Sequence, residues 1–254
     1  MSPSAVSPAP VTLVASELDF SYGRSQVLHS VTLKVRSGER LGIVGESGSG
    51  KTTLAKLLAG VLRSGQVTVN GRPWSAWPRR SEARRSVQLV QQDPFASLTP
   101  HISARGAVAE AARVTGRAPR READQKATEL LNAVGIGSHL ALRRPGTLSG
   151  GQCQRVAIAR ALAAGPSILF ADEPTSALDL SVQAQIINLL LALARDRGLG
   201  LVLVSHDLAV IRHVTERVIV MRRGRIVEHG PTSEVLASPQ HEYTRMLCAA
   251  GLAQ

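Results

Sequence analysis

One short pattern, Gly-x-x-x-x-Gly-Lys-Ser/Thr at residues 45–52, constrains the fold of this 254-residue chain more than any other feature. It follows an apolar run, residues 41–44, and precedes a helix-like stretch, residues 54–59. Glycines let the backbone curl so that successive N–H groups face one anion, and the next helix adds its positive N-terminal end. The setting predicts a strand, a phosphate-binding loop and a helix. The alternative is a Gly/Ser turn that only happens to precede a helix.

The loop also carries side chains suited to a nucleoside triphosphate. Lys51 supplies a point charge for the outer phosphates, and the Thr52 hydroxyl can hold Mg²⁺. We therefore predict a nucleotide-binding chain with Mg²⁺ as its metal. The residues expected to contact the nucleotide here are Gly45, Glu46, Ser47, Gly48, Ser49, Gly50, Lys51, Thr52 and Thr53.

Length and cysteine content narrow the class of protein. A single α/β domain of this length buries roughly 70–75% of its unfolded surface, enough for a large core without disulfides. The two cysteines, Cys153 and Cys248, lie far apart and in no metal-ligand spacing. We therefore expect neither a disulfide framework nor a zinc site, and a reducing compartment fits. Cys153 is expected to be a small packing residue in a helix.

We expect neither a signal peptide nor a membrane span in this sequence. Residues 1–10 are rich in Ser, Pro and Ala, with no basic head and no apolar core, so they predict a disordered tail. The longest apolar stretch, residues 186–194, is interrupted by Asn188 and is far shorter than the ~20 residues of a span. The chain is expected to be soluble by itself.

The formal net charge of +11 is carried mostly by arginine, often in pairs. Such a balance favours anionic partners: a nucleotide, a nucleic acid or an acidic lipid. No aromatic residues interleave with the arginine pairs, which weakens the nucleic-acid hypothesis. Most of these arginines are expected to lie on solvated faces without a specific role.

The first third of the chain is rich in predicted strands. Alternating apolar residues predict strands over residues 11–22 and 27–35. A short strand, residues 66–69, ends in an Asn-Gly turn pair, and residues 86–91 predict a buried strand.

The middle of the chain, residues 94–145, is rich in Ala, Arg and Glu and is predicted to be an inserted helical subdomain. One helix face in it follows the i, i+3, i+4, i+7 spacing and stops at a glycine. The residues of that face and its stop are Ala127, Leu130, Leu131, Val134 and Gly135.

Strands and helices alternate after this subdomain, which predicts a parallel sheet covered on its faces. The predicted elements are helix 152–163, strand 168–171, helix 182–195 and strand 201–205. Residues 218–228 predict a hairpin, and a short helical tail is expected from residue 231.

Polar residues follow four of the predicted strands at the point where each ends. They are Gly45, Gln92, the pair Asp172 and Glu173, and His206. In an open α/β sheet, ligands bind beyond the carboxyl ends of the strands. We therefore expect these residues to converge on one site.

Two acids at the end of an apolar strand are unusual, because a buried carboxylate without a partner is costly. We assign Asp172 to Mg²⁺, through water, and Glu173 to the water that attacks the γ-phosphate, as its general base. Two further residues are candidates: His206 as a donor to the γ-phosphate, and Gln92 as a contact to Mg²⁺ or the attacking water. The alternatives are a strand-end pair that caps the next turn, an ordinary surface histidine and an uninvolved glutamine.

Residues 148–152, Leu-Ser-Gly-Gly-Gln, open a second helix that is suited to an anion. Ser149 suits an N-cap, and Gly150 and Gly151 allow an anion to approach free N–H groups, with Gln152 next in the helix. An ordinary capped helix is the alternative. Because one chain then has two phosphate-binding helix ends, the second is expected to serve a nucleotide held by another subunit. Tyr22 is a candidate for stacking on the base, although a core or edge role is nearly as plausible.

Taken together, these residues resemble the ATP-binding subunits of ABC transporters over essentially the whole chain. The match includes the Walker A loop 45–53, the glutamine of the Q-loop, the signature 148–152, the Walker B segment 168–174, the D-loop 176–179 and the switch His206. The resemblance implies an α/β P-loop NTPase with a mainly parallel core sheet, an antiparallel β subdomain and an inserted helical subdomain at about residues 94–155. The ATPase domain would span residues 11–230, followed by a short C-terminal segment, 231–254.

The resemblance also implies a mechanism. Two ATP molecules would be sandwiched in a head-to-tail dimer, with Ser149, Gly151 and Gln152 acting in trans and Asp179 at the interface. ATP would close the dimer, and hydrolysis with Glu173 as base would reopen it. The helical subdomain would pass this motion to membrane partners.

Two segments resemble the dipeptide, oligopeptide and nickel importer group: residues 92–100 and 239–245, the latter reading Pro-Gln-His-Glu-Tyr-Thr-Arg. The sequence departs from that group at Phe95, Thr99 and Glu242. The resemblance implies an importer ATPase at the cytoplasmic face of the inner membrane, peripheral to it. Its partners would be permease subunits, a second ATPase subunit (homo- or heterodimer) and, indirectly, a substrate-binding protein. An ATPase of a soluble complex, such as the one associated with carbon–phosphorus lyase, is the alternative. DNA repair or translation ATPases rank last.

Overall fold

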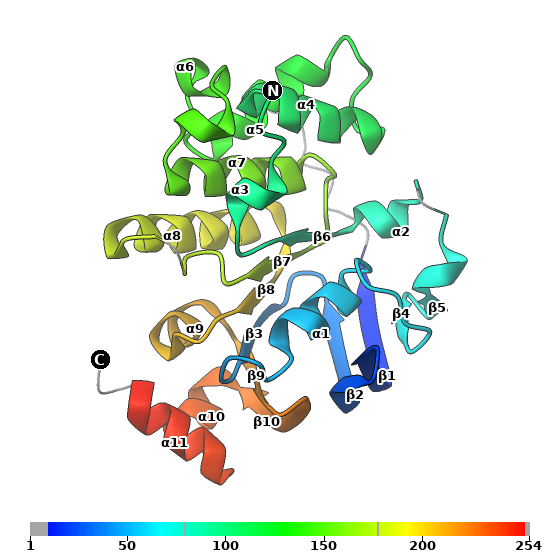
Figure 1. Cartoon of the computed structure of the whole chain (residues 1–254), viewed down its shortest axis with the longest axis vertical. Coiled ribbons are helices and arrows are strands. Elements are labelled where there is room, and N and C mark those ends of the chain that lie inside the picture. The colour runs from blue at the N-terminus through cyan, green and yellow to red at the C-terminus, as the bar shows by residue number, and fades with distance from the viewer. Residues whose placement is uncertain (1–9, 79, 177, 252–254) are drawn as a thin grey trace.

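The computed structural model describes residues 10–78, 80–176 and 178–251. The tail predicted over residues 1–10 therefore lies outside the described residues, apart from Pro10, and so does one residue of the D-loop. In Figure 1 a helical region lies at the top, an antiparallel sheet at the lower right, and the C-terminal helices at the lower left.

A six-stranded sheet forms the centre of the molecule, in the order β10-β9-β3-β8-β7-β6. Strands β9, β3, β8, β7 and β6 run parallel, and only β10 pairs antiparallel with its neighbour. The predicted parallel sheet and the predicted hairpin are both confirmed. The strands are β3 (Arg40–Val44), β6 (Val87–Val90), β7 (Ile168–Asp172), β8 (Gly200–Val204), β9 (Arg217–Arg222) and β10 (Arg225–Pro231).

A second sheet is antiparallel, in the order β2-β1-β4-β5. Asn70 and Gly71, the predicted turn pair, have φ values of 50° and 77° between β4 and β5, as a tight hairpin turn requires. The strands are β1 (Thr12–Tyr22), β2 (Ser25–Arg36), β4 (Val67–Val69) and β5 (Arg72–Pro73). The fold is thus α/β, with a mainly parallel core sheet and an antiparallel β subdomain.

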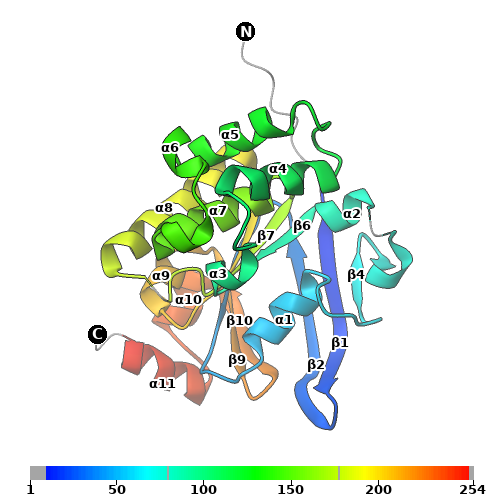
Figure 2. The same ribbon diagram turned by 45° about the horizontal axis from the view of Figure 1, so that its top comes forward.

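Helix α1 (Lys51–Leu58) is packed between the two sheets. Its Leu54 and Leu57 are fully buried with Leu13 of β1 and Ile43 of β3, and Figure 2 shows the helix between the two groups of strands. Because the loop that precedes α1 leaves β3 directly, this burial fixes where the loop emerges.

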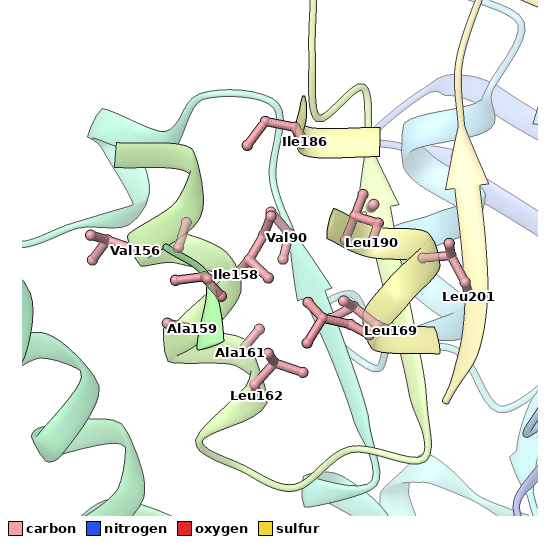
Figure 3. Close-up of a cluster of buried hydrophobic side chains, with 14 of the residues drawn as sticks. Val90, Val156, Ile158, Ala159, Ala161, Leu162, Leu169, Ile186, Leu190 and Leu201 are labelled. Carbon is pink, nitrogen blue, oxygen red and sulfur yellow. The ribbon is translucent and has the colours of Figure 1, made fainter. Parts of the chain in front are cut away.

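The opposite face of the core sheet is covered by α7 (Gly150–Leu162), α8 (Leu180–Arg197) and α9 (Leu208–Val214). Figure 3 shows Ile158 of α7 and Leu190 of α8 converging on Leu169 of β7. Side chains along β7 alternate: Leu169 belongs to this core and Phe170 to the core around α1, as the period of a strand dictates.

The helical region contains α3 (Pro94–Ser97), α4 (Ala104–Val114), α5 (Ala123–Ala133) and α6 (Ser138–Ala141), packed on α7. The predicted apolar face of residues 127–134 is buried on α5, and Gly135 ends that helix with a φ of 76°. Three further short helices are η1 (Trp74–Ala76), α2 (Glu82–Arg85) and, just before the signature, η2 (Pro145–Thr147). The tail forms α10 (Thr232–Ala237) and α11 (Glu242–Gly251).

Cys153 is fully buried on α7, and burial raises the pKa of its thiol to about 11. Because Cys153 belongs to the hydrophobic core around α7, the packing role predicted for it is confirmed. No helix within the described ranges has the length and apolar character that a membrane span requires.

Some of the arginines expected on solvated faces have structural contacts. The Arg84 guanidinium donates to the Trp74 carbonyl at 2.8 Å and lies 5.5 Å from the centre of its ring. Arg222 lies over the ring of Tyr243 at 4.8 Å. These two arginines were expected to have no specific role, but their contacts with Trp74 and Tyr243 help to stabilise the fold.

Phe170 is among the largest fully buried side chains and lies two residues before Asp172 on β7. We predict that Phe170→Ala lowers the free energy of unfolding by about 3–5 kcal/mol, because it leaves a cavity beneath the site. Urea denaturation monitored by circular dichroism measures this. Phe95→Ala is the matched control, because Phe95 is 46% exposed. A loss below about 1 kcal/mol at Phe170 would show that the core tolerates the cavity.

Candidate nucleotide-binding site

The predicted phosphate-binding loop leaves β3 at Val44 and enters α1 at Lys51. Its three glycines all have positive φ: 151° at Gly45, 79° at Gly48 and 98° at Gly50. A Cβ at Gly45 would lie 2.2 Å from the carbonyl oxygen of Met221, so this position also requires glycine for space. The backbone therefore curls as an anion cradle requires.

Helix α1 begins at Lys51, after the N-cap residue Gly50, without a side-chain cap and without an acidic residue in its first turn. The N–H groups of Lys51, Thr52 and Thr53 have no acceptor four residues earlier within the helix, as in any first turn. They and the helix dipole offer a site for a negative group.

Lys51 is folded back over its own loop. Its ammonium group donates to the carbonyl oxygens of Gly45 at 2.8 Å and Glu46 at 2.9 Å. Burial lowers the pKa of Lys51, and the carboxylates of Glu173 and Asp172 work in the opposite direction. The contacts hold the cation beside the loop amides, where phosphate oxygens are expected.

Asp172 is 2% exposed and accepts a hydrogen bond of 3.0 Å from the Thr52 hydroxyl. Burial raises the pKa of Asp172, and the bond from Thr52 opposes that shift. Asp172 is the last residue of β7 and does not follow the strand as predicted, but its side chain still reaches the loop.

Glu173 lies at the centre of a polar cluster. Gln92 Nε2 donates to its Oε2 at 3.2 Å, and His206 Nδ1 lies 3.5 Å from its Oε1. Gln92 Nε2 also donates to the Ser176 hydroxyl at 3.2 Å. The φ of Glu173 is 43°, a conformation that costs free energy in a non-glycine residue, and its N–H donates to the Val204 carbonyl at 3.0 Å. Strain of this kind is common at functional sites.

The structure therefore brings together residues that follow three different strands, as predicted, and a residue of α1, the helix entered from the loop after β3. Gln92 follows β6, Glu173 follows β7 and His206 follows β8, and Thr52 reaches the same cluster through Asp172. His206 is mostly exposed, with 66% of its side chain accessible, while Glu173 is at 20%. The open side of the cluster faces solvent through the histidine.

The signature residues form a separate surface on α7. Ser149 accepts from the Gln152 N–H at 3.3 Å, and the Gln152 side chain accepts from the Ser149 N–H at 3.0 Å. This reciprocal capping box explains the helix start. A Cβ at Gly151 would lie 2.5 Å from Val182 of α8, so glycine is needed where the two helices meet.

Asp179 and Tyr22 take up the other predicted positions. Asp179 caps α8, accepting from the Val182 N–H at 3.0 Å and the Ser181 hydroxyl at 2.7 Å. The Ser181 hydroxyl and the Val182 N–H lower the pKa of Asp179. Tyr22 is 50% exposed at the end of β1 and packs edge-on against Phe20, so its ring is accessible to a base.

One contact of the loop was missed by the sequence analysis. The Glu46 N–H donates to the hydroxyl of Tyr243, on α11, at 2.7 Å. The two residues are 197 positions apart, and no local pattern links them. The only sequence signal was that Tyr243 belongs to the distinctive segment 239–245.

Comparison with known proteins gives the family. The ABC transporter family model matches residues 28–176. A probable D,D-dipeptide transport ATP-binding protein of Escherichia coli is 46% identical over 220 residues, covering 87% of this chain and 68% of that protein. A probable peptide ABC transporter ATP-binding protein of Sinorhizobium fredii is 46% identical over 230 residues, covering 89% and 65%. The chain belongs to the ABC transporter family, and it spans about two thirds of the length of these relatives.

A glutathione import ATP-binding protein of Escherichia coli is 44% identical over 241 residues. The match covers 89% of this chain and 39% of that protein. Among solved structures, a dimeric ATP-binding cassette in a post-hydrolysis state, bound to ADP and Pi, superposes with a TM-score of 0.76 at 31% identity, covering 87% of this chain and 98% of that one. A subunit of an ABC transporter complex from Clostridium perfringens superposes with a TM-score of 0.77 at 30% identity. The match covers 89% of this chain and 90% of that one. The fold is that of an ABC ATPase.

The residues present fit a magnesium–nucleotide complex. Positive φ at three loop glycines, and the close approach of the Met221 carbonyl to Gly45, give the loop the curled backbone that an amide cradle requires. Beside it, a hydroxyl and a carboxylate, Thr52 and Asp172, lie 3.0 Å apart, and oxygen donors of this kind are those that Mg²⁺ prefers.

Two glycines of the loop separate the effect of space from the effect of φ. We predict that Gly45→Ala lowers the free energy of unfolding by about 3 kcal/mol or more, since the new methyl group meets backbone. Gly48→Ala is the control: its φ is also positive, but a Cβ there would have no described atom within 4 Å. It is expected to cost only about 1–2 kcal/mol. Urea denaturation without nucleotide gives both values, and equal losses would contradict the close approach to Met221.

Proposed function

We propose that this chain binds and hydrolyses ATP as the energising subunit of an importer for peptides or for nickel complexes. The observation that carries the proposal is the carboxylate cluster at the end of β7, joined to the phosphate-binding loop through Thr52 and Asp172. The names of the relatives support peptide or glutathione import. Nickel stays open because the sequence resemblance covers both kinds of cargo.

The phosphate-binding loop holds the triphosphate. Amides of residues 46–53 donate to its oxygens, and Lys51 supplies a positive charge where negative charge gathers. Tyr22 offers a ring for the base. When bound, Mg²⁺ would neutralise phosphate charge beside the Thr52 hydroxyl and the Asp172 carboxylate.

Glu173 acts as the general base. Its carboxylate accepts a proton from water as the water oxygen forms a bond to the γ-phosphorus, while the bond to the oxygen bridging the β- and γ-phosphates breaks and ADP leaves. Gln92 holds one oxygen of Glu173 from the β6 side and His206 lies beside the other, so both orient the base. His206 can also donate to the γ-phosphate.

The signature serves the nucleotide of a second subunit in this proposal. Ser149, Gly150, Gly151 and Gln152 start α7 on a surface of their own, and Leu180, next to Asp179, is 84% exposed. The second subunit would be either another copy of this chain or a different ATPase subunit of the same type.

Membrane partners would dock on the helical side. A hollow of about 250 Å³ is lined by Gln92, Phe95 and Leu178, among other residues, and its walls link the Q-loop to the D-loop. A permease loop seated there would sense both segments. The chain would then work at the cytoplasmic face of the inner membrane, with a binding protein acting on the permeases from outside.

The alternative, an ATPase of a soluble complex such as the one associated with carbon–phosphorus lyase, shares the same site chemistry. The relatives' names favour import. Co-purification separates the two: membrane proteins support transport, and soluble phosphonate enzymes support the alternative.

We predict that Glu173→Gln keeps ATP affinity within about threefold, traps a closed dimer and lowers turnover by about 10²–10⁴-fold, because the amide cannot take a proton. Phosphate release and gel filtration with ATP measure these effects. Glu216→Gln is the matched control, since the Glu216 carboxylate is mostly exposed and pairs with Arg40 at the surface. Parental turnover in the Glu173 variant would remove it as the base.

We further predict that Lys51→Ala raises the Kd for ATP by at least about tenfold, because a buried charge facing the phosphates is lost. Lys126→Ala removes a surface lysine paired with Glu129 and is the control. Binding of a fluorescent ATP analogue reports the affinity. Unchanged affinity in the Lys51 variant would place the nucleotide elsewhere.

A further inference from the structure

The C-terminal segment touches the phosphate-binding loop at one point. Tyr243, near the start of α11, is 5% exposed, and its hydroxyl oxygen accepts the Glu46 N–H at 2.7 Å. Glu46 is the second residue of the loop, so this bond fixes the orientation of the peptide through which the chain turns after β3.

The Tyr243 ring is itself held in place. The Arg222 guanidinium lies 4.8 Å from the ring centre, and Arg222 ends β9, which pairs in parallel with β3. Burial raises the pKa of Tyr243, so the phenol stays neutral at physiological pH. A neutral hydroxyl on a fixed ring is a well-defined acceptor.

The segment 239–245, which we name the C-terminal clasp, is anchored on β10. The Glu228 carboxylate accepts the N–H groups of Gln240 at 2.8 Å and His241 at 3.0 Å. His241 Nδ1 accepts the Tyr243 N–H at 3.1 Å, and the Arg245 guanidinium donates to the Gln240 carbonyl at 2.9 Å. The side chains of the clasp are therefore used to hold Tyr243 in position.

The β9–β10 hairpin, which carries the anchor of the clasp, contacts the loop at a second point. The Gly224 N–H, in the turn between β9 and β10, donates to the Ser49 carbonyl at 3.0 Å. The loop is thus supported near its start by Tyr243 and near its end by Gly224. Both supports belong to one unit made of β9, β10 and α11.

We propose that Tyr243 is a positioning residue for the phosphate-binding loop, and that the clasp thereby sets the affinity for ATP without touching the nucleotide. The inference rests on the assignment of residues 45–53 as the ATP site. A loop that must find its shape before binding loses affinity in proportion to the time it spends in other shapes. The hydrogen bond from Glu46 removes part of that loss.

The test is Tyr243→Phe, which keeps the ring over Arg222 and removes only the acceptor. The Kd for ATP is expected to rise about five- to tenfold, the size of a lost hydrogen bond, while kcat at saturating ATP stays within about twofold. Backbone amide exchange of the peptide 44–50 should become faster without nucleotide, while the peptide 168–172 stays unchanged. Met246→Ala is the control, since Met246 is on the same helix and 61% exposed.

The outcomes distinguish this inference from the site assignment. If Lys51→Ala loses ATP but Tyr243→Phe matches the parent in Kd and in exchange of 44–50, the clasp has no positioning role. If Lys51→Ala also binds like the parent, the site assignment fails and the inference with it. Should the Tyr243 variant not fold, Glu228→Gln loosens the clasp from its anchor and is judged by the same two readouts.

Discussion

The site depends on one constraint: several backbone N–H groups of the phosphate-binding loop must point at the same anion. The loop reaches that shape through positive φ at Gly45, Gly48 and Gly50, and the Lys51 ammonium group donates to two of its carbonyl oxygens. Further support comes from outside the loop. The β9 backbone lies against Gly45, Gly224 holds Ser49, and α1 is buried between two sheets. A cradle fixed in advance in this way spends little binding free energy on ordering itself.

Burial of opposite charges beside that cradle has a second consequence. Burial lowers the pKa of Lys51 and raises that of Asp172, so each group is destabilised in its charged form by its surroundings. Hydrogen bonds offset part of this cost: Lys51 donates to the loop carbonyls, and Asp172 accepts from the Thr52 hydroxyl. A triphosphate with its cation would supply further partners to both, so the strain on the ion-binding groups is relieved by ligand binding.

The sequence predicted the parallel sheet well, because strands and helices alternate from residue 150 onward and each carries an apolar pattern. It also predicted that Gln92, Glu173 and His206 would meet, since strand ends share one sheet edge. It missed α9, a helix of seven residues whose clearest signal is the cap at Asp207. It missed the contact of Tyr243 as well, because a bond across 197 residues depends on how the β9–β10 hairpin and α11 pack, which no local pattern encodes.

The central claim, a preformed amide cradle that grips a triphosphate with the help of one ammonium group, is tested most directly by isothermal titration calorimetry of the folded chain with ATP and magnesium. The account predicts saturable binding with one ATP per chain. No heat of association across several temperatures, with circular dichroism confirming that the chain is folded, would contradict it.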